Sequence, residues 1–353
     1  MKEGWEYKKL GDVCEILDSR RKPITKNKRE PGTIPYYGAT GILDYVKDYI
    51  FDEKLVLLGE DGAKWGAGEN SSYIIEGKTW VNNHAHALRP KRELLVDELL
   101  VYYLNFANLQ PFITGVTVPK LNQEKMRSIE IPVPPLSEQQ SIVDYLDSVF
   151  AKIDAMKANA EKALNEAKAL FQASLKEMLE PKEGWERKTL EHFARIIHGK
   201  NQKEVIDSKG LYPIYGSGGN IMGYANAYLC EAGTTILGRK GTIDNPLFIK
   251  ERFWNVDTAF GIIARDNCNK KFLYYSVKKI DWAKRNTGTT LPSLTQNVVY
   301  NVEMSAPSLS EQQSIVDYLD SLKSKVDRLQ ENYDKISQEC DALKQAILRD
   351  IFE

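Results

Sequence analysis

The sequence has few of the residues on which metal centres, disulfide frameworks and membrane spans depend. The chain of 353 residues contains four histidines and four cysteines. Cys14, Cys230, Cys268 and Cys340 are scattered, so we expect reduced thiols and neither disulfides nor a metal site. No apolar run reaches the roughly 20 residues of a membrane helix, and no signal peptide is expected at the start. These features predict a cytoplasmic protein.

Signatures of catalysis are also lacking. Residues 233–241 resemble a phosphate-binding loop, but Lys240 falls one place late and no Ser or Thr follows it directly. The string NPLF at 245–248 lacks the second proline of an adenine-methylating motif, and no glycine-rich cofactor loop precedes it. We therefore expect no catalytic residue, no metal and no cofactor.

The chain does contain an internal sequence repeat. KEGWE at 2–6 returns at 182–186, and the thirteen-residue string LSEQQSIVDYLDS at 136–148 returns at 309–321. A repeat of this length exceeds the 20–50 residues of a solenoid unit and predicts a duplicated domain. We expect boundaries at 1–135, 136–181, 182–307 and 308–353.

Charge separates these segments. Residues 1–135 carry a net charge of 0 and residues 182–307 carry +6, whereas residues 136–181 and 308–353 carry −3 and −4. A polyanion is therefore expected to contact the two larger segments and not the acidic ones.

The acidic segments are predicted to be long helices. Ser137 and Ser310 each stand three residues before a Gln, which predicts a capping box. Apolar or small residues then recur with alternating steps of four and three, from Ile142 to Leu170 and from Ile315 to Ile347. This period predicts a coiled coil between the two helices; the alternative is that each helix packs on its own domain.

The larger segments are predicted to be mixed α/β domains with short strands. Their glycines, prolines and tryptophans match while the residues between differ: IPYYG at 34–38 matches YPIYG at 212–216, and GEDG at 59–62 matches GRKG at 238–241. Identical helix starts suit two copies of one partner, and divergent domains suit two ligands. The alternative is that recombination homogenised the helix starts.

The order domain–helix–domain–helix, the two LSEQQ strings and the motifs IPYYG, LGEDG and WVNNHAHAL together resemble the specificity subunit of a type I restriction–modification system. The resemblance covers essentially the whole chain. It implies an α+β fold: two target recognition domains joined and separated by two long antiparallel coiled-coil helices, with a pseudo-two-fold repeat.

In function, the resemblance implies a non-catalytic subunit that binds double-stranded DNA at a bipartite, asymmetric site. It also implies two modification (methyltransferase) subunits and further restriction subunits as partners. A rigid helix pair would fix the unread spacer, so deleting a heptad from both helices is expected to change its length. The alternative function is a two-headed coiled-coil adaptor that joins proteins without binding DNA.

Candidate DNA-contacting residues lie in four pairs of loops. Six of the ten residues at 20–29 are basic, which suits phosphate contact or simply a solvated loop. The carboxylates at 60–61 correspond in the second repeat to Arg and Lys at 239–240, and this change of sign suits two different half-sites. The favoured alternative is that these residues form salt bridges inside each domain. Asn82, Asn83 and His84 suit adenine or a turn behind Trp80, the latter being favoured. The full set is Arg20, Arg21, Lys22, Lys26, Glu60, Asp61, Lys64, Asn82, Asn83, His84, Lys120, Lys200, Lys203, Arg239, Lys240 and Arg285.

Candidate partner-contacting residues lie in the identical helix starts. They are Ser137, Glu138, Gln139, Gln140 and Tyr145, with Ser310, Glu311, Gln312, Gln313 and Tyr318 in the second copy.

Overall fold

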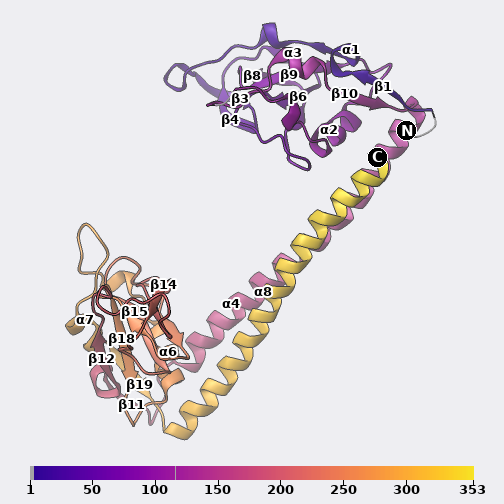
Figure 1. Cartoon of the computed structure of the whole chain (residues 1–353). Coiled ribbons are helices and arrows are strands. Elements are labelled where there is room, and N and C mark those ends of the chain that lie inside the picture. Colours follow the sequence, from indigo (N-terminus) through magenta and orange to yellow (C-terminus); the bar gives the residue numbers. More distant parts are fainter. Residues whose placement is uncertain (1–3, 116) are drawn as a thin grey trace. The chain divides into compact units, whose positions relative to one another are not determined.

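The computed structural model describes residues 4–115 and 117–353 (Figure 1). Its contacts divide the chain into two compact units: unit 1 is Met1–Ala160 with Tyr333–Glu353, and unit 2 is Glu161–Asn332. Each unit contains one globular domain and a segment of each long helix, α4 (Leu136–Met178) and α8 (Leu309–Phe352). None of the helices among the described residues has the length and apolar character of a membrane span.

The domain of unit 1 is built on a four-stranded antiparallel sheet of order β2-β9-β6-β7. Its strands are β2 (Cys14–Ile16), β9 (Ala85–Pro90), β6 (Leu55–Gly59) and β7 (Ser72–Ile75). A second sheet has the order β4-β3-β8-β5, with β3 and β8 parallel. Its strands are β4 (Gly41–Val46), β3 (Pro31–Gly38), β8 (Lys78–Val81) and β5 (Phe51–Asp52). A two-stranded ribbon pairs β1 (Glu6–Lys9) with β10 (Glu130–Val133).

Short helices complete this domain. They are α1 (Leu10–Val13), α2 (Asp97–Phe106) and α3 (Gln123–Arg127), with 3-10 turns at Asp18–Arg20, Lys26–Lys28 and Gln110–Phe112.

The domain of unit 2 repeats this plan, except that no strand of its described residues corresponds to β5. The sheet β12-β18-β15-β16 corresponds to β2-β9-β6-β7, β14-β13-β17 to β4-β3-β8, and β11-β19 to β1-β10. The strands are β11 (Glu186–Thr189), β12 (Ala194–His198), β13 (Tyr212–Tyr215), β14 (Ile221–Ala225), β15 (Thr234–Gly238), β16 (Leu247–Ile249), β17 (Trp254–Asn255), β18 (Ala259–Ala264) and β19 (Glu303–Ala306). The helices are α5 (Leu190–Phe193), α6 (Lys270–Lys279) and α7 (Gln296–Tyr300), with a 3-10 turn at Ala283–Arg285.

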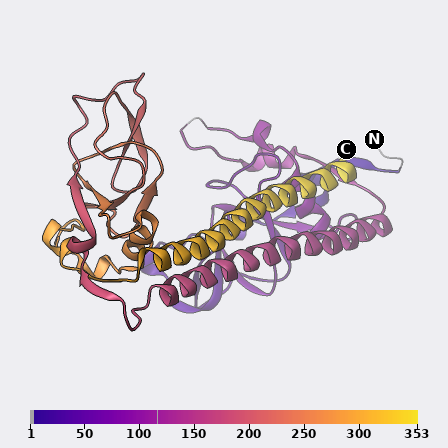
Figure 2. The same ribbon diagram turned by 90° about the horizontal axis from the view of Figure 1, so that it is seen from below.

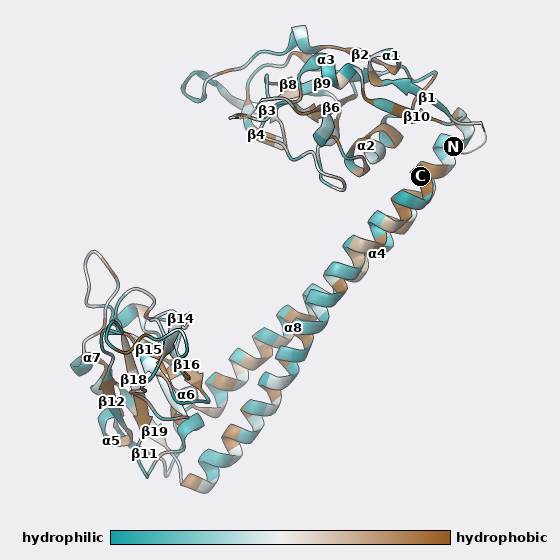
Figure 3. Cartoon of the chain, viewed as in Figure 1, coloured by the Kyte–Doolittle hydropathy of each residue, from teal (hydrophilic) through white to brown (hydrophobic). Residues whose placement is uncertain are grey.

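The central strand β6 divides its side chains between two cores. All five residues are buried, because the sheet is covered on both faces. Val56 and Leu58 pack in the core that contains α2, whereas Leu55 and Leu57 pack against the second sheet, as the two-residue period of a strand requires. Figure 3 shows this strand and its counterpart β15 as hydrophobic elements.

The helix starts differ from the sequence prediction in which residue caps them. Helix α8 begins at Leu309, and Ser308 Oγ accepts the backbone N–H of Glu311 at 3.3 Å. Ser308 with Glu311 is therefore the N-cap pair, and Ser310 already lies inside the helix. In α4 the matching position is Pro135, whose carbonyl accepts the N–H of Glu138 and of Gln139. The capping role predicted for Ser137 and Ser310 was therefore wrong, because the N-cap positions lie two residues earlier, at Pro135 and Ser308.

A buried glutamine locks each helix start to its own domain. Gln139 is fully buried; its Oε1 accepts Val96 N–H at 2.9 Å, and its Nε2 donates to the carbonyls of Leu94 and Pro134 at 2.7 Å. Gln312 makes the matching bonds to Asn269, Asn267 and Pro307. The repeated motif thus joins helix and domain in both units.

Within each unit the two long helices lie side by side and run antiparallel (Figures 1 and 2). In unit 1, Lys157 pairs with Asp341 at 3.2 Å and Asp154 with Lys344 at 2.6 Å. In unit 2, Lys168 Nζ donates to Gln330 Oε1 at 2.8 Å. Along α4 in unit 1, Asp154 precedes Lys157, and their partners Lys344 and Asp341 come in the reverse order along α8, which fixes the antiparallel direction there.

The predicted unbroken apolar seam is only partly correct. Ile153 and Cys340 are buried between the helices, with Cys340 Sγ at 3.8 Å from the carbonyl of Ile153. Met156, Leu170 and Leu343 are each about half exposed or more, although the heptad phase placed them inside. The helix ends also pack into the domain cores, as at Val143 in unit 1 and Leu175 in unit 2. Both interpretations of the helices therefore hold, each over part of their length.

Candidate nucleic-acid interface

Four loops that are distant in sequence meet at one end of the main sheet in unit 1. The loop after β6 contacts the loop before β9, because the N–H groups of Glu60 and Asp61 both donate to the carbonyl of His84. It also contacts the segment before α3, where Leu121 N–H donates to the carbonyl of Glu60 at 2.8 Å. Arg21, in the loop after β2, reaches the same place through its side chain. Loops placed by a sheet in this way are common positions for binding residues.

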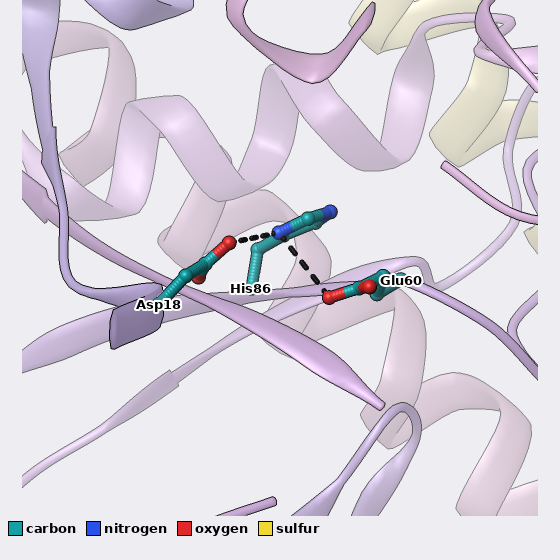
Figure 4. Close-up of side chains that lie close together, drawn as sticks. All are labelled: Asp18, Glu60 and His86. Carbon is teal, nitrogen blue, oxygen red and sulfur yellow. Dashed lines mark hydrogen bonds and ion pairs between the residues drawn. The ribbon is translucent and has the colours of Figure 1, made fainter. Parts of the chain in front are cut away.

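Beneath these loops lies a buried cluster of charges, which we call the unit 1 cluster: Asp18, Arg21, Glu60, His86 and Lys120. His86 Nδ1 lies 2.6 Å from Asp18 Oδ2 and 3.6 Å from Glu60 Oε2 (Figure 4). Glu60 also receives Arg21 Nη1 and Lys120 Nζ, each at 2.6 Å. Arg21 Nη2 lies 3.2 Å from Asp18 Oδ2. Each of the two carboxylates thus has at least one cationic side chain within 3.2 Å.

Both nitrogens of the His86 ring have partners inside the domain. Its Nδ1 faces the carboxylate of Asp18, and its Nε2 faces the carbonyl of Leu121 at 2.7 Å. Both ring nitrogens of His86 therefore face protein oxygens. Burial raises the pKa of both carboxyls, but the opposing bonds prevail. Those from His86 and Arg21 leave the pKa of Asp18 below its ordinary value, and those from Lys120 and Arg21 do the same for Glu60.

The same cluster has the composition of a metal site, but its contacts explain it without one. One oxygen or nitrogen from each of Asp18, Glu60 and His86 lies within 4.8 Å of the others. A metal-binding histidine needs one ring nitrogen free for the ion, whereas both nitrogens of His86 already lie against protein oxygens. Arg21 and Lys120 already supply the positive charge that a cation would bring.

Glu60, Asp61 and His84 have different exposures. Glu60 is buried in the cluster, as the favoured salt-bridge alternative predicted, and cannot reach a base. Asp61 bonds His84 Nδ1, and the His84 side chain is 50% exposed. Since Asp61 fixes one ring nitrogen, His84 presents Nε2 to the outside. Lys120 extends outward from the cluster, with 42% of its side chain exposed.

The asparagines at 82 and 83 are also divided. Asn82 is buried, and its Oδ1 accepts the N–H of His84 at 2.8 Å, which is the turn-stabilising role that sequence analysis favoured. Asn83 is exposed beside it, as is Lys64 in the loop after β6.

The basic stretch 20–29 separates into fixed and free residues. Arg20 stacks on Phe51 and pairs with Glu53, and Arg29 stacks on Tyr36 and pairs with Asp44. Lys22 and Lys26 are exposed. Their loop is held by its backbone, because Trp80 Nε1 donates to the carbonyl of Lys22 at 2.7 Å.

Unit 2 has the same loops with different side chains. Trp254 Nε1 donates to the carbonyl of Lys200 at 3.0 Å, as Trp80 does to Lys22. The strand pairings place His198 where unit 1 has Asp18, Arg239 where it has Glu60, and Phe260 where it has His86. Arg239 lies over the Phe260 ring at 5.9 Å. Lys240 is exposed, and its backbone bridges Ser293 as Asp61 bridges Lys120.

The remaining candidates of unit 2 are not all in this place. Lys203 is exposed in the same loop as Lys200. Arg285 instead lines a groove formed by β11, β19 and the end of α6.

Sequence analysis missed Asp18, His86, His198, Gln123 and Gln296. Gln123 Nε2 donates to Asp18 at 3.1 Å, and Gln296 makes the matching contact to His198 Nε2 at 2.5 Å. The offset of 180 residues that relates the two domain starts also relates Asp18 to His198, so aligning the repeats by that offset would have revealed the first pair.

The partner candidates also divide by exposure. Gln139 and Gln312 are occupied inside the domains, so neither is available to a partner. Glu138 accepts Trp5 Nε1 at 2.8 Å. Glu311 is exposed, and the matched residues that face outward in both helices are Ser137, Gln140 and Tyr145 with Ser310, Gln313 and Tyr318.

Comparison with known proteins identifies this architecture. The family model described as the type I restriction modification DNA specificity domain matches residues 2–166 and again 182–338. The chain belongs to this family. Its two copies of the domain correspond to the two repeats in the sequence, and the chain is a type I restriction–modification specificity subunit.

Its relatives match over most of their length. A putative type I restriction enzyme specificity subunit of Haemophilus influenzae is 30% identical over 90% of this chain and 88% of its own. The MjaVIII specificity subunit of Methanocaldococcus jannaschii is 23% identical over 92% and 87%.

Solved structures of the family share the fold. A chain described in work on complex assembly and conformational transition of the type I restriction–modification system superposes with a TM-score of 0.77 at 18% identity, over 99% of this chain and 97% of that one. The specificity subunit of Thermoanaerobacter tengcongensis gives 0.57 at 18% identity, over 100% and 97%.

Proposed function

We propose that this specificity subunit binds a bipartite, asymmetric DNA sequence, with each domain contacting one half. The observation that supports this most is the pairing of loops: the same backbone positions carry Asp61, His84 and Lys120 in unit 1 but Lys240, Thr258 and Ser293 in unit 2. A common scaffold with different outward side chains is what two unlike half-sites require.

The outward groups suit base and phosphate contacts. Carboxylates accept from cytosine N4, and lysine donates to guanine O6 and N7. Exposed lysines at 22 and 26 in unit 1, and at 200 and 203 in unit 2, suit phosphate contacts that position the domain. Arg21, Glu60, Asn82 and Arg239 are better placed to support these loops than to touch DNA.

The partners proposed from the family resemblance are two modification subunits and then restriction subunits. The matched exposed residues at the helix starts, such as Tyr145 and Tyr318, support two equivalent contacts with one kind of partner. Methyl transfer and ATP-dependent chemistry are assigned to those partners, so the subunit is proposed to be non-catalytic and to act in the cytoplasm.

Co-expression with the cognate modification subunit tests the proposal. Methylated adenines mapped across the host genome should fall in a two-part motif, with marks on both strands. A complex that assembles but methylates at random positions, or not at all, would contradict the proposal and favour the protein adaptor. The matched variants are Asp61→Ala and Lys240→Ala, which should each relax a different half of the motif.

A further inference from the structure

Unit 2 contains a groove of about 920 Å³ away from the loops described above. It is formed by the end of α4, by β11 and β19, and by the end of α6 with the 3-10 turn that follows. Its floor is formed by three apolar side chains that are nearly buried, Leu179, Val302 and Met304. Five of its lining residues are basic and two are acidic, which gives a net charge of +3; they are Arg187, Lys188, Lys279, Lys284 and Arg285, with Asp281 and Glu303.

Unit 1 has aromatic side chains at the same place. The hydrogen-bonding patterns of the two units align Tyr103 with Ser276 and Phe106 with Lys279 on the helices α2 and α6. Phe352, the last residue of α8, corresponds to Leu179, the residue that directly follows α4. Phe352 stacks on Phe106 with ring centroids at 5.6 Å and meets Tyr103 edge-on at 5.3 Å.

At the rim of the groove, too, uncharged residues of unit 1 correspond to cationic residues of unit 2. The ribbon pairings align Tyr7 with Arg187, and the matching 3-10 turns align Pro111 with Lys284 and Phe112 with Arg285. Where unit 1 fills and lines the position with its own rings, unit 2 leaves an open groove edged with cations. Half of the +6 charge of residues 182–307 is accounted for by this one groove.

From this exchange we infer that the groove of unit 2 binds an acidic peptide segment of a partner protein, anchored by one aromatic side chain. The cations at the rim complement its carboxylates. The partner supplies the ring that unit 2 lacks, and this ring rests on the apolar floor, where the smaller Leu179 holds the position of Phe352. An apolar floor contributes nothing to binding a phosphate backbone, so the groove fits a peptide better than DNA. The inference does not depend on base recognition by the loops.

Two cations at the rim are available for such a partner. Arg187 and Lys188 lie exposed on β11. Lys279 and Lys284 have acidic neighbours, Glu180 at 3.3 Å and Asp281 at 3.1 Å. The Lys284 pair is solvent-exposed and therefore weak enough to exchange for a partner carboxylate, whereas Lys279 also donates to the carbonyl of Leu179 at 2.8 Å.

Fluorescence anisotropy with the full chain tests the inference. The probe is a labelled peptide in which one Phe is flanked on both sides by Glu, compared with the same peptide carrying Ala in place of Phe. The Phe peptide should bind at least about tenfold more tightly, because burial of one large apolar side chain contributes that much or more. Its affinity should fall with added salt.

Two variants localise the binding. Ser276→Tyr with Lys279→Phe installs the aromatic residues of unit 1 and fills the groove; Arg187→Glu with Arg285→Glu reverses charge at the rim. Each pair should weaken the Phe peptide by about tenfold or more. The matched control, Lys209→Glu with Lys250→Glu, changes two exposed lysines of unit 2 outside the groove and should leave binding unchanged.

Three outcomes would overturn the inference. The first is equal affinity for the Phe and Ala peptides, and the second is an equal loss in the control variant. The third is a rim variant that loses binding to a labelled DNA duplex but keeps the peptide, which would assign the groove to nucleic acid. Since the methylation motif reports on the loops independently, failure here leaves the proposed function standing.

Discussion

The two domains solve the same structural problem with opposite charges. In unit 1, buried carboxylates beneath the loops are neutralised by His86, Arg21 and Lys120. In unit 2, the matched positions hold His198, Arg239 and Phe260, and Arg239 lies over an aromatic ring. The first arrangement requires every member, because a buried charge that loses its partner is strongly destabilising. The second tolerates change, because Arg239 keeps access to solvent.

The contrast shows where the two halves were free to diverge. At the helix starts the glutamine contacts are the same in both units, down to the three backbone groups they satisfy. Beneath the loops, by contrast, the buried residues of the unit 1 cluster are replaced by other residue types in unit 2. The contacts that join helix to domain are retained, and in the loops the backbone contacts are retained while the side chains differ.

The largest effect on stability is expected from removing Glu60, the residue at the centre of the unit 1 cluster. Glu60→Ala removes the shared partner of Arg21 and Lys120 and should lower the free energy of unfolding of unit 1 by about 3 kcal/mol. The matched change Arg239→Ala should cost less than about 1 kcal/mol in unit 2. Hydrogen exchange measured separately on β6 and β15 checks both. Equal losses in the two units would show that the clusters are equally essential.

Acid should destabilise unit 1 before unit 2. The pKa values of Asp18 and Glu60 in the folded state lie below their ordinary values of 3.8 and 4.5. These groups therefore stabilise the fold above those values, and the contribution is lost as the pH falls through the lower folded-state pKa. The loss should be smaller than that of Glu60→Ala, because the protonated side chains still fill their space. Hydrogen exchange at decreasing pH checks it, with Glu60→Gln as the control that should reduce the dependence.

A smaller effect is expected on DNA selectivity. Asp61→Ala should reduce discrimination at one base pair of the half-site bound by unit 1 by about tenfold, and Lys240→Ala should do so for the other half. Competition between duplexes altered in one half at a time measures this. If both variants relaxed the same half-site, the assignment of one domain to each half would fail.

The smallest effect concerns the helix starts. Ser308→Ala removes the N-cap of α8 and should cost about 1 kcal/mol. Introducing Ser at the matching Pro135 should gain little, because Pro is already compatible with the residues that precede a helix. Thermal unfolding of both variants checks the difference. A loss below a few tenths of a kcal/mol for Ser308→Ala would show that the buried Gln312 alone sets the helix start.

The repeat, the two long helices and the paired loops could be predicted because they depend on local signals. Proline and the LSEQQ strings mark the helix starts, and glycine marks the loops at 59–62 and 238–241. The buried cluster could not be predicted in this way. Asp18 and His86 lie on different strands, and the neighbours Glu60 and Asp61 point to different surroundings, which only tertiary packing decides.

The groove escaped prediction for a related reason. A groove depends on which side chains occupy the space. In unit 1 this space is occupied by Phe352, which is far along the chain from Phe106 and Tyr103. The heptad pattern was likewise misleading where helix ends enter the domain cores. Periodicity reports that a face is apolar but not which neighbour covers it.

The tryptophans at 80 and 254 hold the loops that differ between the two units through a carbonyl oxygen of the main chain. That atom is present whatever amino acid occupies the position, so a change of residue there leaves the fastening intact. Evolution can thus exchange the side chains of these loops without first repairing the fold, and new target preferences become accessible by single steps.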